Sequence, residues 1–81
     1  MTLAYDRRAD VLYISFETLP PNAYIVVENR AGDVLKLNKK NNSVIVCTIP
    51  YFQQRLKKGK LVVPEISGIP FNELAKELAQ P

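Results

Sequence analysis

Five short segments rich in aliphatic, β-branched and aromatic residues dominate the first fifty positions, and polar stretches separate them. The segments cover residues 2–5, 11–16, 23–29, 34–38 and 43–49. Residues of these types favour strands, and short connections join neighbouring strands as antiparallel hairpins. We therefore predict a five-stranded antiparallel β-meander, in which Tyr13 and Tyr24 lie on adjacent strands.

The pattern changes to helical spacing after the fifth segment. Pro50 fits the first position of a helix, because proline has no amide hydrogen to lose there, and Gly59 is a suitable stop. A second amphipathic helix opens at Pro70 or Asn72. The expected fold class is therefore α+β. One domain over residues 1–81 carries an antiparallel β-meander of about five strands, followed by two short C-terminal helices.

A chain of 81 residues is short for a stable core, so a disulfide, a metal or a partner subunit would help to stabilise it. Cys47 is the only cysteine, which excludes an intramolecular disulfide and suits a reducing compartment. There is no histidine, the commonest transition-metal ligand. No apolar run is long enough for a signal peptide or a membrane span. We expect a soluble, cytoplasmic protein that uses no metal or cofactor, does not enter a membrane and associates with another chain.

Two of the expected strands are apolar on both faces. One face of the fifth strand carries Val44 and Val46, and the other carries Ile45, Cys47 and Ile49. The third strand is similar, whereas a sheet with one face in water alternates more cleanly between apolar and polar residues. The C-terminal helices can cover one face, and a second subunit is the simplest cover for the other. The sequence thus predicts a homodimer; the alternative is a monomer whose loops and first helix cover both faces.

The stretch from Tyr5 to Ile14 carries a recognisable motif. The motif resembles the start of the DUF2283 family, small bacterial and archaeal proteins of unknown function that typically read Tyr-Asp-x-Glu-Ala-Asp-x-Leu-Tyr-Ile. The residues that fit it are Tyr5, Asp6, Ala9, Asp10, Leu12, Tyr13 and Ile14. Arg8 stands where the family commonly has glutamate. Over residues 3–50 the resemblance implies a β-meander with helical additions and no established activity.

Asp6 and Asp10 flank the first turn, and paired carboxylates can divide acid and base roles or bind a hard cation. Arg7 and Arg8 lie between them, and the loop lacks the six or so oxygen ligands of a calcium site. We favour a structural role, in which Asp6 forms an Asx-type turn and Asp10 pairs with an arginine. Cys47 is expected in the core, and no motif for phosphate binding, nucleophilic catalysis or metal binding is present.

Basic residues concentrate in one part of the chain. Residues 36–60 hold seven basic side chains and no acid, although the whole chain has a net charge of only +3. Those that could contact an anion are Lys39, Lys40, Arg55, Lys57, Lys58 and Lys60. A positive patch fits a nucleic acid or an acidic protein surface. The same residues also suit solubility, protection of strand edges, or pairing with acidic segments of a partner subunit.

The sequence therefore identifies no catalytic residue, no metal ligand and no cofactor site. The leading hypothesis is a small non-enzymatic domain that acts through protein association, as a homodimer. The alternative is a nucleic-acid-binding or antitoxin-like regulator that uses the basic segment 36–60. A third hypothesis, an enzyme or metal binder at Asp6 and Asp10, has the least support.

Overall fold

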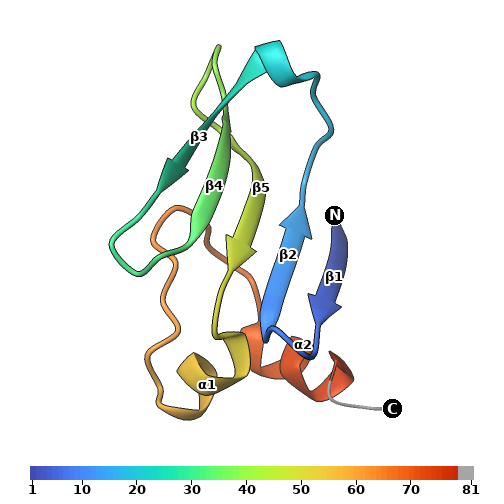
Figure 1. The fold of residues 1–81 in the computed structure, drawn as a ribbon, viewed down its shortest axis with the longest axis vertical. Helices are drawn as coiled ribbons and strands as arrows, with labels where there is room; N and C mark the ends of the chain where they lie inside the picture. The colour runs from blue at the N-terminus through green and yellow to red at the C-terminus, as the bar shows by residue number, and fades with distance from the viewer. Residues whose placement is uncertain (79–81) are drawn as a thin grey trace.

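The computed structural model describes residues 1–78, and its strands lie close to the predicted positions (Figure 1). The strands are β1 (Thr2–Asp6), β2 (Val11–Ser15), β3 (Tyr24–Glu28), β4 (Val34–Asn38) and β5 (Val44–Ile49). All neighbouring strands pair antiparallel in one five-stranded sheet. Together with the helices α1 (Phe52–Lys57) and α2 (Phe71–Leu78), this sheet confirms the predicted α+β class.

The order of the strands differs from the predicted meander. The sheet reads β1-β2-β5-β4-β3, so β2 pairs with β5, and β3 forms the far edge. The connection over residues 16–23 contains Pro20 and Pro21 and the short 3-10 helix η1 (Pro21–Ala23). Proline lacks the amide hydrogen of a hairpin ladder, so the chain crosses the end of the sheet instead of turning back beside β2. The result is a Greek-key order. The prediction that Tyr13 and Tyr24 lie on adjacent strands is therefore wrong.

The central position of β5 follows from its composition. As the most apolar strand, it is flanked by β2 on one side and β4 on the other. Leu12 faces Ile49 across the β2–β5 pair, and Ile14 faces Cys47, so their side chains meet on the same face of the sheet. All four of these residues are fully buried. Burial of this apolar row stabilises the non-local pairing that short-range hairpin signals do not indicate.

A shift of register on β5 changes one predicted face assignment. Lys36 pairs with Val46, whereas the next residue of β4, Leu37, pairs with Val44, which leaves Ile45 without a partner on β4. Such a bulge turns the bulged strand locally. Val44 consequently packs against the core cluster, whereas Val46 lies on the opposite face. The prediction that Val44 and Val46 share a face is therefore wrong.

The first helix begins later than predicted. Its first residue is Phe52, because Tyr51 adopts a left-handed conformation, with φ 52° and ψ 41°, and so stands outside the helix. Pro50 is consequently part of the turn between β5 and α1 and not the first helical residue. The helix ends before Gly59, which has a positive φ of 67° and closes the last turn, as expected.

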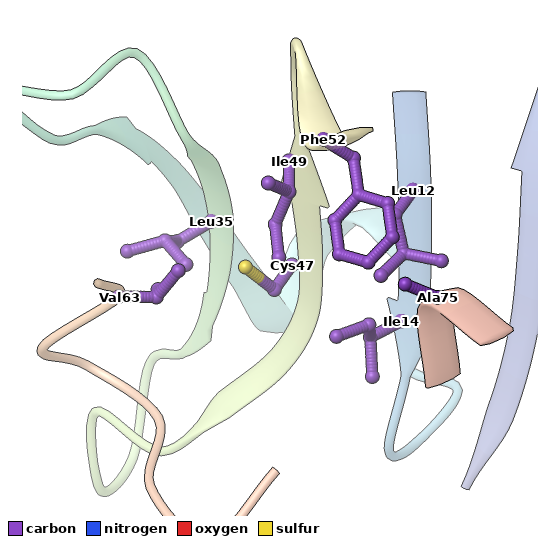
Figure 2. Close-up of a cluster of buried hydrophobic side chains, with 8 residues drawn as sticks. All are labelled: Leu12, Ile14, Leu35, Cys47, Ile49, Phe52, Val63 and Ala75. Atoms are coloured by element: carbon purple, nitrogen blue, oxygen red, sulfur yellow. The ribbon is translucent and has the colours of Figure 1, made fainter. Parts of the chain in front are cut away.

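The second helix agrees with its prediction, and both helices contribute to the core. Leu74 and Ala75 of α2 are buried, as the amphipathic pattern indicated. Figure 2 shows how the core brings together side chains from β2, β4 and β5 with one residue each from α1, the segment between the helices, and α2. These residues are Leu12, Ile14, Leu35, Cys47, Ile49, Phe52, Val63 and Ala75. All the covering elements therefore pack on a single face of the sheet.

Candidate functional site

The opposite face of the sheet has no cover within residues 1–78. The cross-strand register arranges its side chains in two rows. One row is Ala4, Tyr13, Thr48, Val34 and Glu28, and the other is Thr2, Ser15, Val46, Lys36 and Val26. None of these ten residues, here called the uncovered face, falls in the buried class, and the core cluster lies on the other side of the sheet.

Half of the uncovered face is apolar: Tyr13, Val46, Val34 and Val26 follow one another diagonally across β2, β5, β4 and β3, and Ala4 lies beside Tyr13 on β1. Tyr13 is 41% exposed and Val26 is 58% exposed, although both lie in the middle of regular strands. Val34 and Val46 are half-buried between their neighbours on the sheet. Single exposed apolar residues are ordinary, whereas a contiguous apolar surface marks a place of interaction.

Two opposite charges stand among these apolar residues. The ammonium of Lys36 lies 4.9 Å from the centre of the Tyr24 ring, in a cation–π contact across β3 and β4. Glu28 ends β3 in the neighbouring row. The only ion pair found within residues 1–78 is Arg55–Asp33, so neither Lys36 nor Glu28 is neutralised by a carboxylate or cation of its own subunit. The face thus carries one cation and one carboxylate for another surface to pair.

The turn between β1 and β2 uses Asp6 as predicted. Its Oδ1 accepts hydrogen bonds from the amides of Arg8 at 3.0 Å and Ala9 at 3.2 Å, which is an Asx-type turn. This carboxylate therefore builds the backbone turn, and its geometry gives no sign of acid–base work.

Asp10 has a different role from the expected arginine pair. It adopts a positive φ of 57°, and its carboxylate reaches the start of α1. There Oδ1 accepts from the amide of Gln53 at 2.8 Å, and Oδ2 accepts from the amide of Gln54 at 3.3 Å. The hydroxyl of Tyr5 donates to Oδ1 at 2.7 Å. Asp10 therefore binds the first amides of α1 from a distant part of the chain, in the way that an N-cap side chain does.

These contacts shift two ionisations in opposite directions. Burial alone would raise the pKa of Asp10, but the hydrogen bonds from Gln53, Tyr5 and Gln54 outweigh it and hold that pKa below its usual value. Burial, together with the bond to the Asp10 carboxylate, raises the pKa of Tyr5 to about 12. The pair is thus held as a neutral phenol and an ionised carboxylate over a wide pH range.

No family model, curated protein or solved structure matches this chain. The resemblance of its opening motif to DUF2283 therefore stays a prediction. The motif does have structural uses here: Leu12 and Ile14 are buried, and Tyr5, Asp6 and Asp10 bond within the fold. Tyr13 differs from them, because its side chain lies on the uncovered face.

Cys47 lies in the core, as predicted. Its side chain is fully buried on β5. Burial, with smaller contributions from the charges of Asp33 and Glu65, raises the pKa of its thiol to about 12. Within residues 1–78 no group of three or more histidine, cysteine or acidic side chains lies together to hold a metal ion. No helix in that part of the chain is long and apolar enough to cross a membrane.

The predicted basic residues do not form one patch. Lys39 and Lys40 lie in the β4–β5 turn, and Lys57, Lys58 and Lys60 follow or end α1 at the opposite end of the domain (Figure 1). The six residues of β5 separate the two groups by roughly 20 Å. Each group must therefore be considered as a separate surface.

Arg55 belongs to neither group, because it is used inside the fold. Its guanidinium contacts the fully buried carboxylate of Asp33, with nitrogen–oxygen distances of 2.6 and 3.4 Å. Asn29 donates to the same carboxylate at 3.0 Å, and its own side-chain oxygen accepts from the amides of Ala31 and Asp33. This pair ties the β3–β4 turn to α1.

Asp33 and Asn29 were not predicted from the sequence. Asp33 follows Gly32 in a stretch that reads as an ordinary turn, and its partner Arg55 is 22 residues away. Nothing in the sequence around an aspartate shows by itself that its side chain will be buried. The sole indication in the sequence is that residues 36–60 contain cations and no acid, so an acid elsewhere must satisfy any cation that becomes buried.

Proposed function

We propose that this protein is a non-enzymatic association module that forms a homodimer through the uncovered face. The observation that supports the proposal is the apolar surface of Tyr13, Val26, Val34 and Val46, which no part of residues 1–78 covers. A strand with apolar residues on both faces, such as β5, is characteristic of a sheet packed on two sides. In a dimer the second sheet would supply the missing layer.

Sheet-on-sheet packing suits the form of this surface. Two sheets stack about 10 Å apart with strands about 30° from parallel, and their inward side chains interdigitate. The face offers medium-sized side chains for such packing, with the ring of Tyr13 on β2 and valines on β3, β4 and β5. Contact between two such faces would bury additional apolar surface, which stabilises a domain whose own core is small.

A second copy of the chain fits the charges of the face better than an arbitrary partner does. Lys36 and Glu28 are one cation and one carboxylate, and Asp6, at the end of β1, is engaged in its turn. A two-fold axis places the same surface on both sides, so each Lys36 can meet the partner's carboxylate without leaving charge in excess. Face-to-face self-association therefore requires no unpaired buried charge.

The test is multi-angle light scattering of the wild type and of Tyr13→Lys across the micromolar range. We expect a dimer for the wild type. In the dimer, a lysine at position 13 would have to be buried without a carboxylate, so dissociation should become at least about tenfold more favourable, or ~1.4 kcal/mol.

Phe16→Lys is the matched control. Phe16 is 39% exposed against 41% for Tyr13 and lies just beyond the same strand, beside Val44 and Ile66 on the covered side of the sheet. This variant should remain dimeric. A wild type that is monomeric throughout the micromolar range would refute the proposal, as would equal dissociation of both variants.

A further inference from the structure

A second surface, away from the uncovered face, lies where the β3–β4 turn approaches α1. A pocket of about 440 Å³ opens there to solvent. It is lined by Ala31, Tyr51, Gln54, Arg55, Lys58 and Lys60. This volume is in the range of small-molecule sites and is far larger than a single phosphate needs.

The lining of this pocket is positive. It contains three cations and no carboxylate. Asp33 pairs with Arg55 and is fully buried. Lys58 and Lys60 are exposed, and neither forms an ion pair within residues 1–78. Two free ammonium groups therefore stand at the pocket, with a guanidinium beside them.

Tyr51 is the second unusual feature of the pocket. Its backbone has φ 52° and ψ 41°, a left-handed conformation that bulky residues rarely adopt and that asparagine or glycine adopts more easily. Its side chain is 61% exposed. The ring takes part in neither of the aromatic contacts found in the described chain, which join Tyr5, Phe52 and Phe71. The fold thus holds a strained backbone at Tyr51 and leaves this residue largely exposed.

We propose that this pocket binds a nucleotide unit, with the base stacked on Tyr51 and the phosphate held by Lys58 and Lys60. An aromatic platform beside cations is how proteins hold a base and its phosphate without reading the sequence, because every base has a stacking face. Strained residues of this kind concentrate at ligand sites. The first amides of α1 already bond to Asp10, so the side chains must supply the phosphate contacts.

The proposal refines the predicted basic segment and stands apart from the dimer. The pocket at the α1 end combines Lys58 and Lys60 with the exposed Tyr51, whereas Lys39 and Lys40 at the other end share their surface with Glu17. None of the pocket residues belongs to the uncovered face. The nucleotide unit can be free or part of a single strand, since both present the same base and phosphate.

The experiment measures binding of adenosine monophosphate and of a fluorescein-labelled single-stranded oligothymidylate at low salt, followed by a salt series. Binding by the monophosphate with no tighter binding by the strand identifies a free nucleotide as the ligand. Tighter binding by the strand, with log K falling as log salt rises, identifies single-stranded nucleic acid. Either result supports the site. If neither probe binds at low salt, the proposal is wrong.

Tyr51→Asn tests the effect of the ring on binding separately from its effect on stability. Asparagine tolerates a positive φ, so this variant should melt at or above the wild-type temperature while it loses affinity at least about tenfold. Lys58→Gln with Lys60→Gln should lose as much. Lys39→Gln with Lys40→Gln is the matched control, which removes the same charge at the opposite end and should bind within about twofold of wild type.

Three outcomes would contradict the proposal. If the Lys39 and Lys40 variant weakens binding as much as the Lys58 and Lys60 variant, the affinity is a property of net charge and not of the pocket. If Tyr51→Asn binds as the wild type does, no base stacks there. If inorganic phosphate or a polyglutamate peptide competes as well as adenosine monophosphate does, the pocket does not select a nucleotide.

Discussion

Asp10 connects two distant parts of the chain through a single carboxylate. Its two oxygens cap the first amides of α1 and accept the hydroxyl of Tyr5, so the first turn and the helix depend on each other. An aspartate at φ 57° is also one of the few residue types that tolerate this backbone conformation. The residue therefore combines a conformational and an electrostatic role.

Asp10→Asn should destabilise the protein by about 1–2 kcal/mol at neutral pH, because the amide keeps the left-handed backbone but loses one acceptor and the charge. The folded pKa of Asp10 is below its unfolded value of about 3.9, so its stabilisation is present above that value and lost as the pH falls through the folded pKa. Urea unfolding at pH 7 and near pH 2 provides the measurement. The difference in free energy of unfolding between wild type and variant should be smaller at the acidic pH.

Asp6→Asn is the control for this comparison. Both hydrogen bonds to Asp6 end on Oδ1, and asparagine retains that oxygen, so the free energy of unfolding should change by less than about 0.5 kcal/mol. If the difference in free energy of unfolding between wild type and Asp10→Asn stays constant from neutral to acidic pH, the charge of Asp10 does not stabilise the fold.

At the scale of elements, the Arg55–Asp33 pair fastens α1 to the β3–β4 turn. Arg55→Met should cost about 3–5 kcal/mol, because it leaves the Asp33 carboxylate buried without a cation. Lys57→Met on the same helix is exposed and should change stability by less than about 0.5 kcal/mol. Urea midpoints of the two variants and of Arg55→Met combined with Asp33→Asn provide the measurement. The double variant should recover part of the loss, and no recovery would place the effect of Arg55 outside this pair.

The elements themselves were largely predictable, because strand alternation and helical spacing are local. The strand at 34–38 and the apolar face of α2 are read directly from neighbouring residues. The pairing of Leu12 with Ile49 was not predictable in this way, since it depends on which distant strand buries the apolar row of β2. The predicted meander followed from connection length alone, and it failed at Pro20 and Pro21, where the chain crosses the sheet.

The sites were less predictable than the fold, for physical reasons. Apolar residues on both faces of β5 could be read from the sequence, because side-chain alternation is local, but the bulge that moves Val44 to the core face could not. The basic residues could be divided into two groups only when the position of β5 was known, because this strand separates Lys39 and Lys40 from Lys57, Lys58 and Lys60. The left-handed backbone at Tyr51 could not be predicted, because the type of a residue does not show whether it will adopt a positive φ.

At the scale of the whole molecule, one side of the sheet holds the entire core and the other holds side chains still in contact with water. The domain therefore has two layers, a sheet and the segments that cover one of its faces. If a second copy covers the other face, the stability of each subunit is linked to protein concentration. The charges of the uncovered face then determine how the two sheets are oriented, because a cation near the middle of an apolar interface must find a carboxylate.

Lys36 and Glu28 allow this orientation to be tested by exchanging charges. Lys36→Glu and Glu28→Lys should each weaken the dimer at least about tenfold, ~1.4 kcal/mol, because each places like charges together across the interface. The double exchange should restore the dissociation constant to within about threefold, because the pair is re-formed with its signs reversed. Lys39→Glu, which makes the same charge change in the β4–β5 turn, should have no comparable effect. A dimer that survives all four variants would show that Lys36 does not meet Glu28 across the interface. A double variant weaker than either single one would place each residue against a different partner group, since restoration requires that the two charges face each other.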